Sequence, residues 1–143
     1  MDNAFRYVIN NGITVSSLYP YQYRTNTCQY DQKEMKPSFT IKTSKIIFSD
    51  CAALTDVLKN RPVTVVVSVN IAFIFYSEGV LNSCGTFINH AIQLVGYYKS
   101  PLRSYYIGKN SWGTAWGQEG FVYIDAVSQN GNLCNVCSYP QYI

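Results

Sequence analysis

Charged side chains are scarce in this sequence. Asp, Glu, Lys and Arg make up 13% of its 143 residues, well under the roughly 25% of ordinary soluble domains. Eleven basic residues against eight acidic ones leave a formal charge of +3, and the basic residues are scattered. Without a basic run or an RNA-binding aromatic motif, the sequence argues against a nucleic-acid partner. Polar cover must come largely from uncharged residues and from 13 tyrosines.

Long apolar runs are also missing. The most apolar stretch, residues 63–75, is interrupted by Thr64, Ser68 and Asn70 and is too short to cross a bilayer. The first three residues have neither the basic flank nor the apolar run of a signal peptide. The sequence therefore predicts no membrane partner. A hydrophobic fraction of 48% is nevertheless enough to build a globular core.

Cysteine is present in an odd number, at Cys28, Cys51, Cys84, Cys134 and Cys137. One interpretation is a cytosolic protein with buried free thiols. However, Cys134 and Cys137 lie in a short polar tail, where thiols have little reason to be buried. This favours disulfides, an oxidising compartment and one thiol left over. A zinc site fits poorly, because its four ligands would have to come from widely separated cysteines and the only histidine.

Apolar spacing predicts helices in the first half of the chain. Four apolar residues at helical intervals open it, and a glycine is placed to end that helix: Met1, Phe5, Val8, Ile9 and Gly12. A loop rich in tyrosine and polar residues follows, to about residue 37. A second helix is expected over 51–59, with Ser49 or Asp50 as its amino-terminal cap, and a short helical turn over 71–76.

Strand patterns dominate the rest of the chain. The strongest is 63–69, which is dense in β-branched residues. Further strands are expected at 39–48, 91–98, 104–109 and 121–126. Because helical segments come first and are followed mostly by strands, the sequence indicates an α+β arrangement rather than alternating βαβ units.

The candidate chemistry lies around the only histidine, His90, and a tryptophan-rich stretch that follows it. His90 opens a predicted strand, where a rigid element can aim a side chain at a cleft. Asn110 ends another predicted strand, and Trp112 and Trp116, the only two tryptophans, come directly after it. A structural interpretation is a tight aromatic loop that packs for stability. The functional interpretation is that Asn110 orients His90 while an indole shields their hydrogen bond from water.

Two sequence blocks resemble the papain and cathepsin L family of cysteine peptidases. The first is Asn89-His90-Ala91-Ile92 with Leu94-Val95-Gly96-Tyr97, and the second is Lys109-Asn110-Ser111-Trp112-Gly113 with Trp116-Gly117 and Gly120-Phe121. The resemblance covers essentially the whole chain. It implies an incomplete papain-like two-domain fold, with a helical-domain remnant at 1–43, a β-barrel-like domain at 44–138 and a tail at 139–143 that crosses back.

The resemblance also implies catalytic roles. His90 would be the general base and acid that pairs with a cysteine thiolate, and Asn110 would hold its ring. Trp112 would shield that contact, and Trp116 would line the leaving-group side of the cleft.

Substrate binding would fall to four further positions. Met1, Val66 and Ile88 would line the hydrophobic pocket for the second residue before the scissile bond. The backbone of Asn89 would contact the substrate; the family usually has Asp there, a change that matters little if only the carbonyl is used. Near the end of the chain, Asn135 replaces a usual glycine in a shortened segment, which leaves the pocket floor and the peptide preference open.

The nucleophilic cysteine of the family is missing. In papain-like enzymes it lies about 130–150 residues before the histidine, so here it would fall roughly 40–60 residues before Met1. None of the five cysteines stands in a C-G-S-C-W context, and the oxyanion-hole glutamine is absent too. We therefore expect a fragment whose Met1 is an internal methionine and whose partner is the missing amino-terminal part. By itself it should be inactive and should fold poorly.

The family pattern also implies a disulfide plan. The cysteine six residues before the histidine, Cys84, would pair with Cys134. The position of Cys28 normally pairs with a cysteine upstream of Met1, which would account for the odd count. Cys51 and Cys137 lie outside the commonest plan, and we expect them to pair with each other.

The implied activity is hydrolysis of peptides or proteins through an acyl-enzyme thioester, with no metal or organic cofactor. The implied location is a lysosome, a vacuole or the outside of the cell. The alternative is an inactive pseudopeptidase, or a binding module with the same fold. A serine hydrolase centred on His90 would need a nucleophile elbow, and the sequence contains no G-x-S-x-G.

Overall fold

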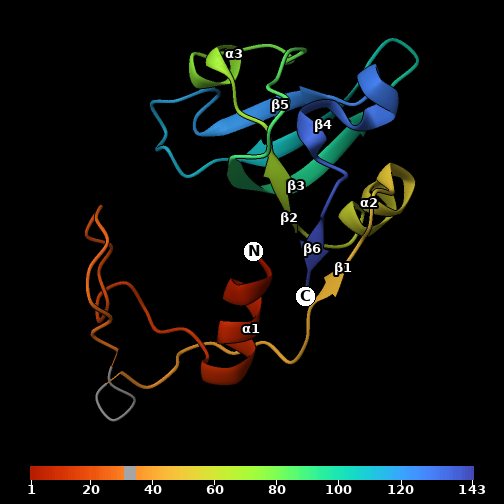
Figure 1. Cartoon of the computed structure of the whole chain (residues 1–143). Coiled ribbons are helices and arrows are strands. Elements are labelled where there is room, and N and C mark those ends of the chain that lie inside the picture. The colour runs from red at the N-terminus through yellow and green to blue at the C-terminus, as the bar shows by residue number, and fades with distance from the viewer. Residues whose placement is uncertain (31–34) are drawn as a thin grey trace. The chain divides into compact units, whose positions relative to one another are not determined.

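A computed structural model describes residues 1–30 and 35–143 of the chain (Figure 1). These residues form two compact units, one of Met1–Ser44 with Ile143 and the other of Lys45–Tyr142. The strand Gln141–Tyr142, in the tail expected at 139–143, belongs to the sheet of the second unit. Among the described residues, no helix is long and apolar enough to cross a membrane.

The first unit contains one helix, α1 (Asp2–Asn11). It ends at Gly12, whose φ of +74° suits glycine, and a Cβ there would lie 2.5 Å from the Cβ of Pro37. The predicted loop to residue 37 includes residues 31–34, which lie outside the described part of the chain. The strand predicted over 39–48 is wrong in extent. Phe39 makes only an isolated bridge to Ile13, because its apolar neighbours pack in the first unit instead of joining the sheet.

The second unit is built on one six-stranded antiparallel sheet in the order β1-β6-β2-β3-β4-β5. Its strands are β1 (Lys45–Ile46), β2 (Val63–Val67), β3 (His90–Lys99), β4 (Ser104–Lys109), β5 (Phe121–Asp125) and β6 (Gln141–Tyr142). The four longer strands confirm the sequence-based predictions to within two residues at each end. β6 was not predicted, because a strand of two residues has no periodicity to read.

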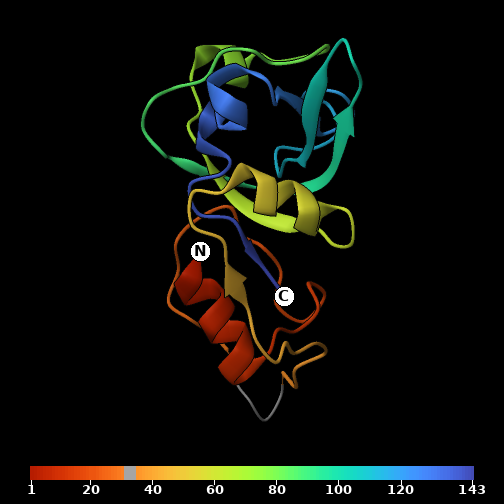
Figure 2. The ribbon, with the colours of Figure 1, turned by 90° about the vertical axis from the view of Figure 1, so that its right-hand side faces the viewer.

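Alternation along β2 shows how the core is formed. Val63, Val65 and Val67 are fully buried, whereas the residues between them are half-buried. Helix α2 (Cys51–Leu58) packs against β2 and β3 (Figure 2) and adds Leu54 and Leu58 to the same core. The sequence pattern therefore places one hydrophobic core between α2 and the sheet.

The helix caps follow from local sequence. Asp50 caps α2, and its Oδ1 accepts a hydrogen bond from the backbone N–H of Ala53 at 2.9 Å. Asn70 caps the short helix α3 (Ile71–Ile74) in the same way through the N–H of Phe73 at 3.0 Å. Two 3-10 turns, η1 (Ser128–Gly131) and η2 (Leu133–Asn135), follow β5.

Two disulfides join these parts of the second unit. Cys51, at the start of α2, is bonded to Cys137, and Cys84 is bonded to Cys134 in η2. The pair Cys84–Cys134 is the one that the family pattern implied, and Cys51–Cys137 is the pair expected for the two cysteines outside that pattern. Cys28 is exposed and free, and it belongs to the first unit.

Candidate active site

His90 and Asn110 meet at the ends of two neighbouring strands. His90 opens β3 opposite Val67 of β2, and Asn110 directly follows the last residue of β4. The Nε2 atom of His90 lies 2.9 Å from the Oδ1 atom of Asn110. Twenty residues apart in sequence, the two side chains are thus brought into hydrogen-bonding distance by the sheet register.

The surroundings of Asn110 determine which imidazole nitrogen carries the proton. Its Oδ1 also accepts a hydrogen bond from the backbone N–H of Ser111 at 2.8 Å, so this atom is an acceptor. The Nε2 of His90 must then be the donor, and Nδ1 is the nitrogen that carries the lone pair in the neutral ring. Asn110 is 8% exposed, and within the described part of the chain its Nδ2 finds no hydrogen-bond partner.

Aromatic rings surround this pair. The ring of Trp112 lies 5.1 Å from the ring of His90, centroid to centroid, and tilts by 32°. Phe73 meets His90 edge-on at 6.5 Å and stacks on Trp116 at 5.4 Å. The indole N–H of Trp116 donates to the carbonyl of Ile74 at 2.8 Å, and this hydrogen bond connects Trp116 to α3. The rings of Trp112 and Phe73 therefore lie beside the ring of His90.

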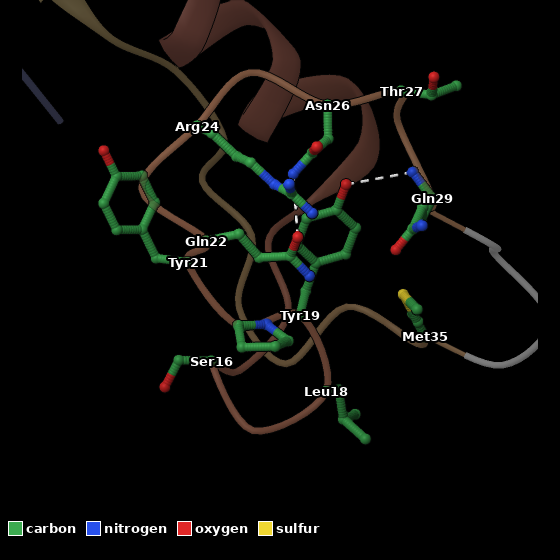
Figure 3. Close-up of a pocket in the computed structure, with 11 residues that line it drawn as sticks. Ser16, Leu18, Tyr19, Tyr21, Gln22, Arg24, Asn26, Thr27, Gln29 and Met35 are labelled. Carbon is green, nitrogen blue, oxygen red and sulfur yellow. Dashed lines mark hydrogen bonds between the residues drawn. The ribbon is translucent and has the colours of Figure 1, made fainter.

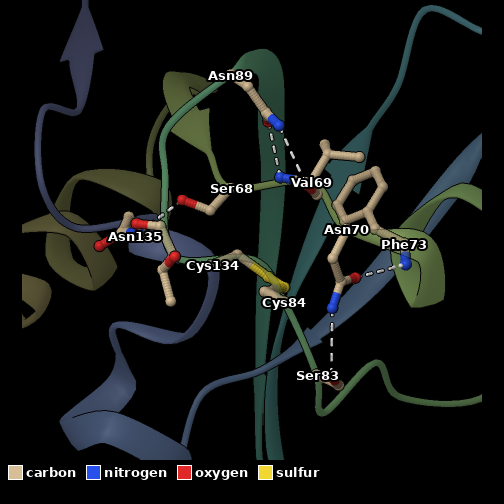
Figure 4. Close-up of a disulfide and its surroundings, with 10 residues drawn as sticks. Ser68, Val69, Asn70, Phe73, Ser83, Cys84, Asn89, Cys134 and Asn135 are labelled. Atoms are coloured by element: carbon tan, nitrogen blue, oxygen red, sulfur yellow. Dashed lines mark hydrogen bonds between the residues drawn. A yellow bond between two sulfur atoms is a disulfide. The ribbon is translucent and has the colours of Figure 1, made fainter.

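Asn89 uses its side chain within the protein, a contact that sequence reasoning missed. Its Oδ1 accepts from the backbone N–H of Val69 at 2.8 Å, and its Nδ2 donates to the carbonyl of the same residue at 3.1 Å (Figure 4). An aspartate carboxylate could make only the first of these bonds. The amide is therefore the group that can bind both the N–H and the carbonyl of Val69.

Asn135 binds Ser68, the residue before Val69. Asn135 Nδ2 donates to the hydroxyl of the fully buried Ser68 at 2.6 Å, next to the disulfide between Cys84 and Cys134 (Figure 4). Asn135 has a φ of +63°, a conformation that glycine and asparagine tolerate best. This explains why asparagine can stand at this position.

The predicted pocket residues are distributed over both units. Val66 is half-buried on β2, and Ile88, two residues before His90, is 43% exposed. Met1 belongs to the first unit. The structure therefore brings His90, Asn110 and the two tryptophans together, while the hydrophobic substrate pocket stays a prediction.

A cavity of about 310 Å³ lies in the first unit (Figure 3). It is enclosed by a polar loop, within which the Nδ2 of Asn26 donates to Gln22 at 2.9 Å and the N–H of Gln29 donates to the hydroxyl of Tyr19 at 3.1 Å. Its lining residues are Ser16, Leu18, Tyr19, Pro20, Tyr21, Gln22, Arg24, Asn26, Thr27, Gln29 and Met35. Arg24 is the only charged side chain among these lining residues.

Free thiols and groups of metal-binding side chains are limited among the described residues. All four cysteines of the second unit are in disulfides, so residues 45–142 offer no thiol to pair with His90. Among the residues that the structure describes, no group of three or more His, Cys, Asp or Glu side chains could hold a metal ion. Within residues 45–142, His90 therefore has no free thiol beside it.

Sequence comparison connects this geometry to known proteins. The sequence model described as "Papain family cysteine protease" matches residues 1–143. Cysteine endopeptidase Rep1 of Oryza sativa subsp. japonica is 37% identical, over 98% of this chain and 40% of its own length. Cathepsin S of Bos taurus is 35% identical, over 99% of this chain and 44% of its own length. The chain therefore spans about 40% of the curated relatives that it matches.

Solved structures agree with the sequence comparison. The bromelain protease from Ananas comosus, in complex with the E64 inhibitor, superposes with a TM-score of 0.87 at 30% identity, covering 97% of this chain and 66% of that one. Digestive procathepsin L 3 of Tenebrio molitor gives a TM-score of 0.88 at 30% identity, covering 99% of this chain and 47% of that one.

Proposed function

The chain belongs to the papain family of cysteine proteases, and we propose that it is the part of a cysteine peptidase that carries the histidine and the asparagine. One observation carries this proposal. The Nε2 of His90 lies 2.9 Å from the Oδ1 of Asn110 under the indole of Trp112. That geometry holds one ring nitrogen and leaves the other available for proton transfer.

The reaction would proceed by nucleophilic catalysis. Nδ1 of His90 takes the proton of a cysteine thiol, and the thiolate attacks the carbonyl carbon of the scissile peptide bond. As the carbon–nitrogen bond breaks, the imidazolium returns the proton to the leaving amine, and the acyl group stays on sulfur as a thioester. His90 then deprotonates a water molecule, which hydrolyses the thioester and releases the acid and the thiol. Asn110 keeps the ring oriented through both steps.

The nucleophile and the oxyanion-hole donor would come from a segment of the protein that this sequence does not contain. Four of the five cysteines form disulfides, and Cys28, in the first unit, is not in a C-G-S-C-W context. The same segment would cover the apolar face of α1, where Phe5 and Val8 line a cavity of about 350 Å³. The missing part is therefore the expected partner of the first unit.

Substrate contacts and location complete the proposal. The substrates would be peptides or proteins. Val66, Ile88 and Met1 would bind the second side chain before the scissile bond, the backbone of Asn89 would bind the main chain, and Trp116 would face the leaving group. Two disulfides support an oxidising compartment, which is consistent with a lysosome, a vacuole or secretion.

The test compares this chain with the protein encoded by the complete reading frame. The 143-residue chain should neither cleave a fluorogenic peptide nor react with a thiol-directed epoxide. The complete protein should do both, and His90→Ala should lower its kcat by at least about a thousandfold. Turnover by the 143-residue chain that depends on His90 would contradict the proposed source of the nucleophile. Peptide binding without turnover by the complete protein would instead identify a non-catalytic member of the family.

A further inference from the structure

The tryptophan loop is the segment after Asn110 that contains Trp112 and Trp116. Several hydrogen bonds near it converge on the phenol of Tyr76, a residue that is 7% exposed. Its hydroxyl donates to the carbonyl of Gly79 at 2.6 Å. It accepts from the backbone N–H of Tyr123 at 3.2 Å and from the side-chain amide of Gln118. Because a phenol has one proton to donate and two lone pairs, every hydrogen-bonding position of this group is occupied.

Gln118 connects that phenol to a hairpin turn. Its Nε2 also donates to the carbonyl of Gly79 at 3.2 Å. Its backbone pairs with Phe121 through two hydrogen bonds of 3.0 Å, across Glu119 and Gly120. These two central residues have φ values of +55° and +90°, as a type I′ turn requires. The Gln118 side chain therefore attaches a tight turn to the buried phenol.

Backbone hydrogen bonds connect this turn to Asn110. The carbonyl of Gly120 accepts a hydrogen bond from the N–H of Asn110 at 2.9 Å, and the N–H of Gly120 donates to the carbonyl of Trp116 at 2.8 Å. Only two residues and one hydrogen bond separate Gln118 from Asn110. A shift of the turn would therefore move the amide that holds His90.

The ring of Tyr76 supports the same loop by packing. It lies 5.7 Å from the ring of Trp116, which in turn contacts the ring of Trp112 at 5.1 Å. At Gly117 a Cβ would lie 3.3 Å from a ring carbon of Tyr76 and 2.5 Å from the carbonyl of Phe121, so glycine is needed for this close approach. The phenol thus holds both the backbone and the indoles of the loop.

We propose that Tyr76 and Gln118 form a clasp that positions Asn110 and Trp112 against His90, which makes both of them positioning residues for the peptidase reaction. The part of this inference that concerns the reaction rests on the proposed function, whereas the part that concerns the orientation of His90 does not. Burial raises the pKa of Tyr76 above its ordinary value, so its hydroxyl keeps the proton that it donates to Gly79 at neutral pH.

The test uses the fact that His90 is the only histidine. In the 143-residue chain labelled with ¹⁵N-histidine, nitrogen chemical shifts recorded above the titration of the imidazole report which nitrogen carries the proton. The unaltered chain should show the Nε2–H form. Tyr76→Phe and Gln118→Ala should each give a mixture of the two tautomers, because Asn110 no longer holds the ring. Tyr98→Phe, which removes an exposed phenol from the same sheet, is the control and should leave the tautomer unchanged.

Retention of the pure Nε2–H form in both variants would refute the proposed positioning role. A lower melting temperature with an unchanged tautomer would mean that Tyr76 and Gln118 only contribute to packing. If Tyr76→Phe does not fold, Gln118→Ala decides the question by the same criterion. In the complete peptidase, the two variants should lower kcat by about tenfold to a hundredfold with little change in KM. Absence of peptidase activity in the unaltered complete protein would contradict the proposed function, while the tautomer measurement would still decide the clasp.

Discussion

The two units of this chain bury very different amounts of apolar surface. Every buried apolar side chain among the described residues lies in the second unit, between α2, the sheet and the turns after β5. In the first unit, α1 has apolar residues at helical spacing but buries none of them. An amphipathic pattern therefore stabilises a structure only where a second apolar face covers it. The second unit contains both faces, and the first unit contains only one.

The largest expected effect comes from separating the units. Residues 45–142 alone should melt cooperatively, because they contain the core and both disulfides. Residues 1–44 alone should be unfolded. Circular dichroism melts of the two pieces measure this, and a lack of cooperative melting by residues 45–142 would show that the comparison is mistaken. The poor folding expected from the sequence would then not be confined to the first unit.

Removal of the disulfide between Cys51 and Cys137 should be the next largest effect. The bond joins residues 86 apart, and opening a loop of that length should lower the free energy of unfolding by about 4 kcal/mol. Cys51→Ser with Cys137→Ser avoids a new free thiol. Urea unfolding can be followed by tryptophan fluorescence, because both tryptophans lie in the second unit.

The control for that experiment is Cys28→Ser, in which an exposed, unpaired thiol of the first unit is replaced. It should leave the urea midpoint unchanged. A stability loss of similar size in Cys28→Ser would mean that the two units do not differ in the way described above.

Truncation of single apolar side chains gives the smallest and sharpest comparison. Leu54→Ala in α2 should cost about 3 kcal/mol, because Leu54 is fully buried and its removal leaves a cavity. Val8→Ala in α1 should cost less than about 0.5 kcal/mol, because that side chain is only half-buried. Urea unfolding is followed by tryptophan fluorescence for Leu54→Ala and by circular dichroism for Val8→Ala, because both tryptophans lie in the second unit. Equal losses at the two positions would refute the difference between the units.

Local patterns predicted the elements of the second unit well. The β-branched run at 63–69 and the Asp50 cap of α2 are short-range features, and the structure has both. The position of His90 at a strand start could also be predicted, because an apolar run begins directly after it. Sequence context offered the pairing of His90 with Asn110 as one of two interpretations, and the family resemblance favoured it.

Long-range features could not be predicted in this way. The pairing of β6 with β1 and β2 joins segments roughly 80 to 100 residues apart and depends on the tertiary fold. The contacts of Asn89 with Val69 and of Gln118 with Tyr76 depend on loop geometry that no spacing encodes. The excess length of the strand predicted at 39–48 has the same origin, since only Lys45–Ile46 pairs with a neighbouring strand of the sheet.

The two disulfides end only three residues apart, at Cys134 and Cys137, and one loop lies inside the other. This nesting has a mechanical consequence. A pulling force applied to the two ends of the chain passes directly from Cys51 to Cys137, which are 86 positions apart, and the segment between them carries no load. Under oxidising conditions only the flanking residues can be extended. Reduction would release about 300 Å of additional contour length, so His90 and Asn110 lie in a part of the chain that carries no tension while this disulfide is intact.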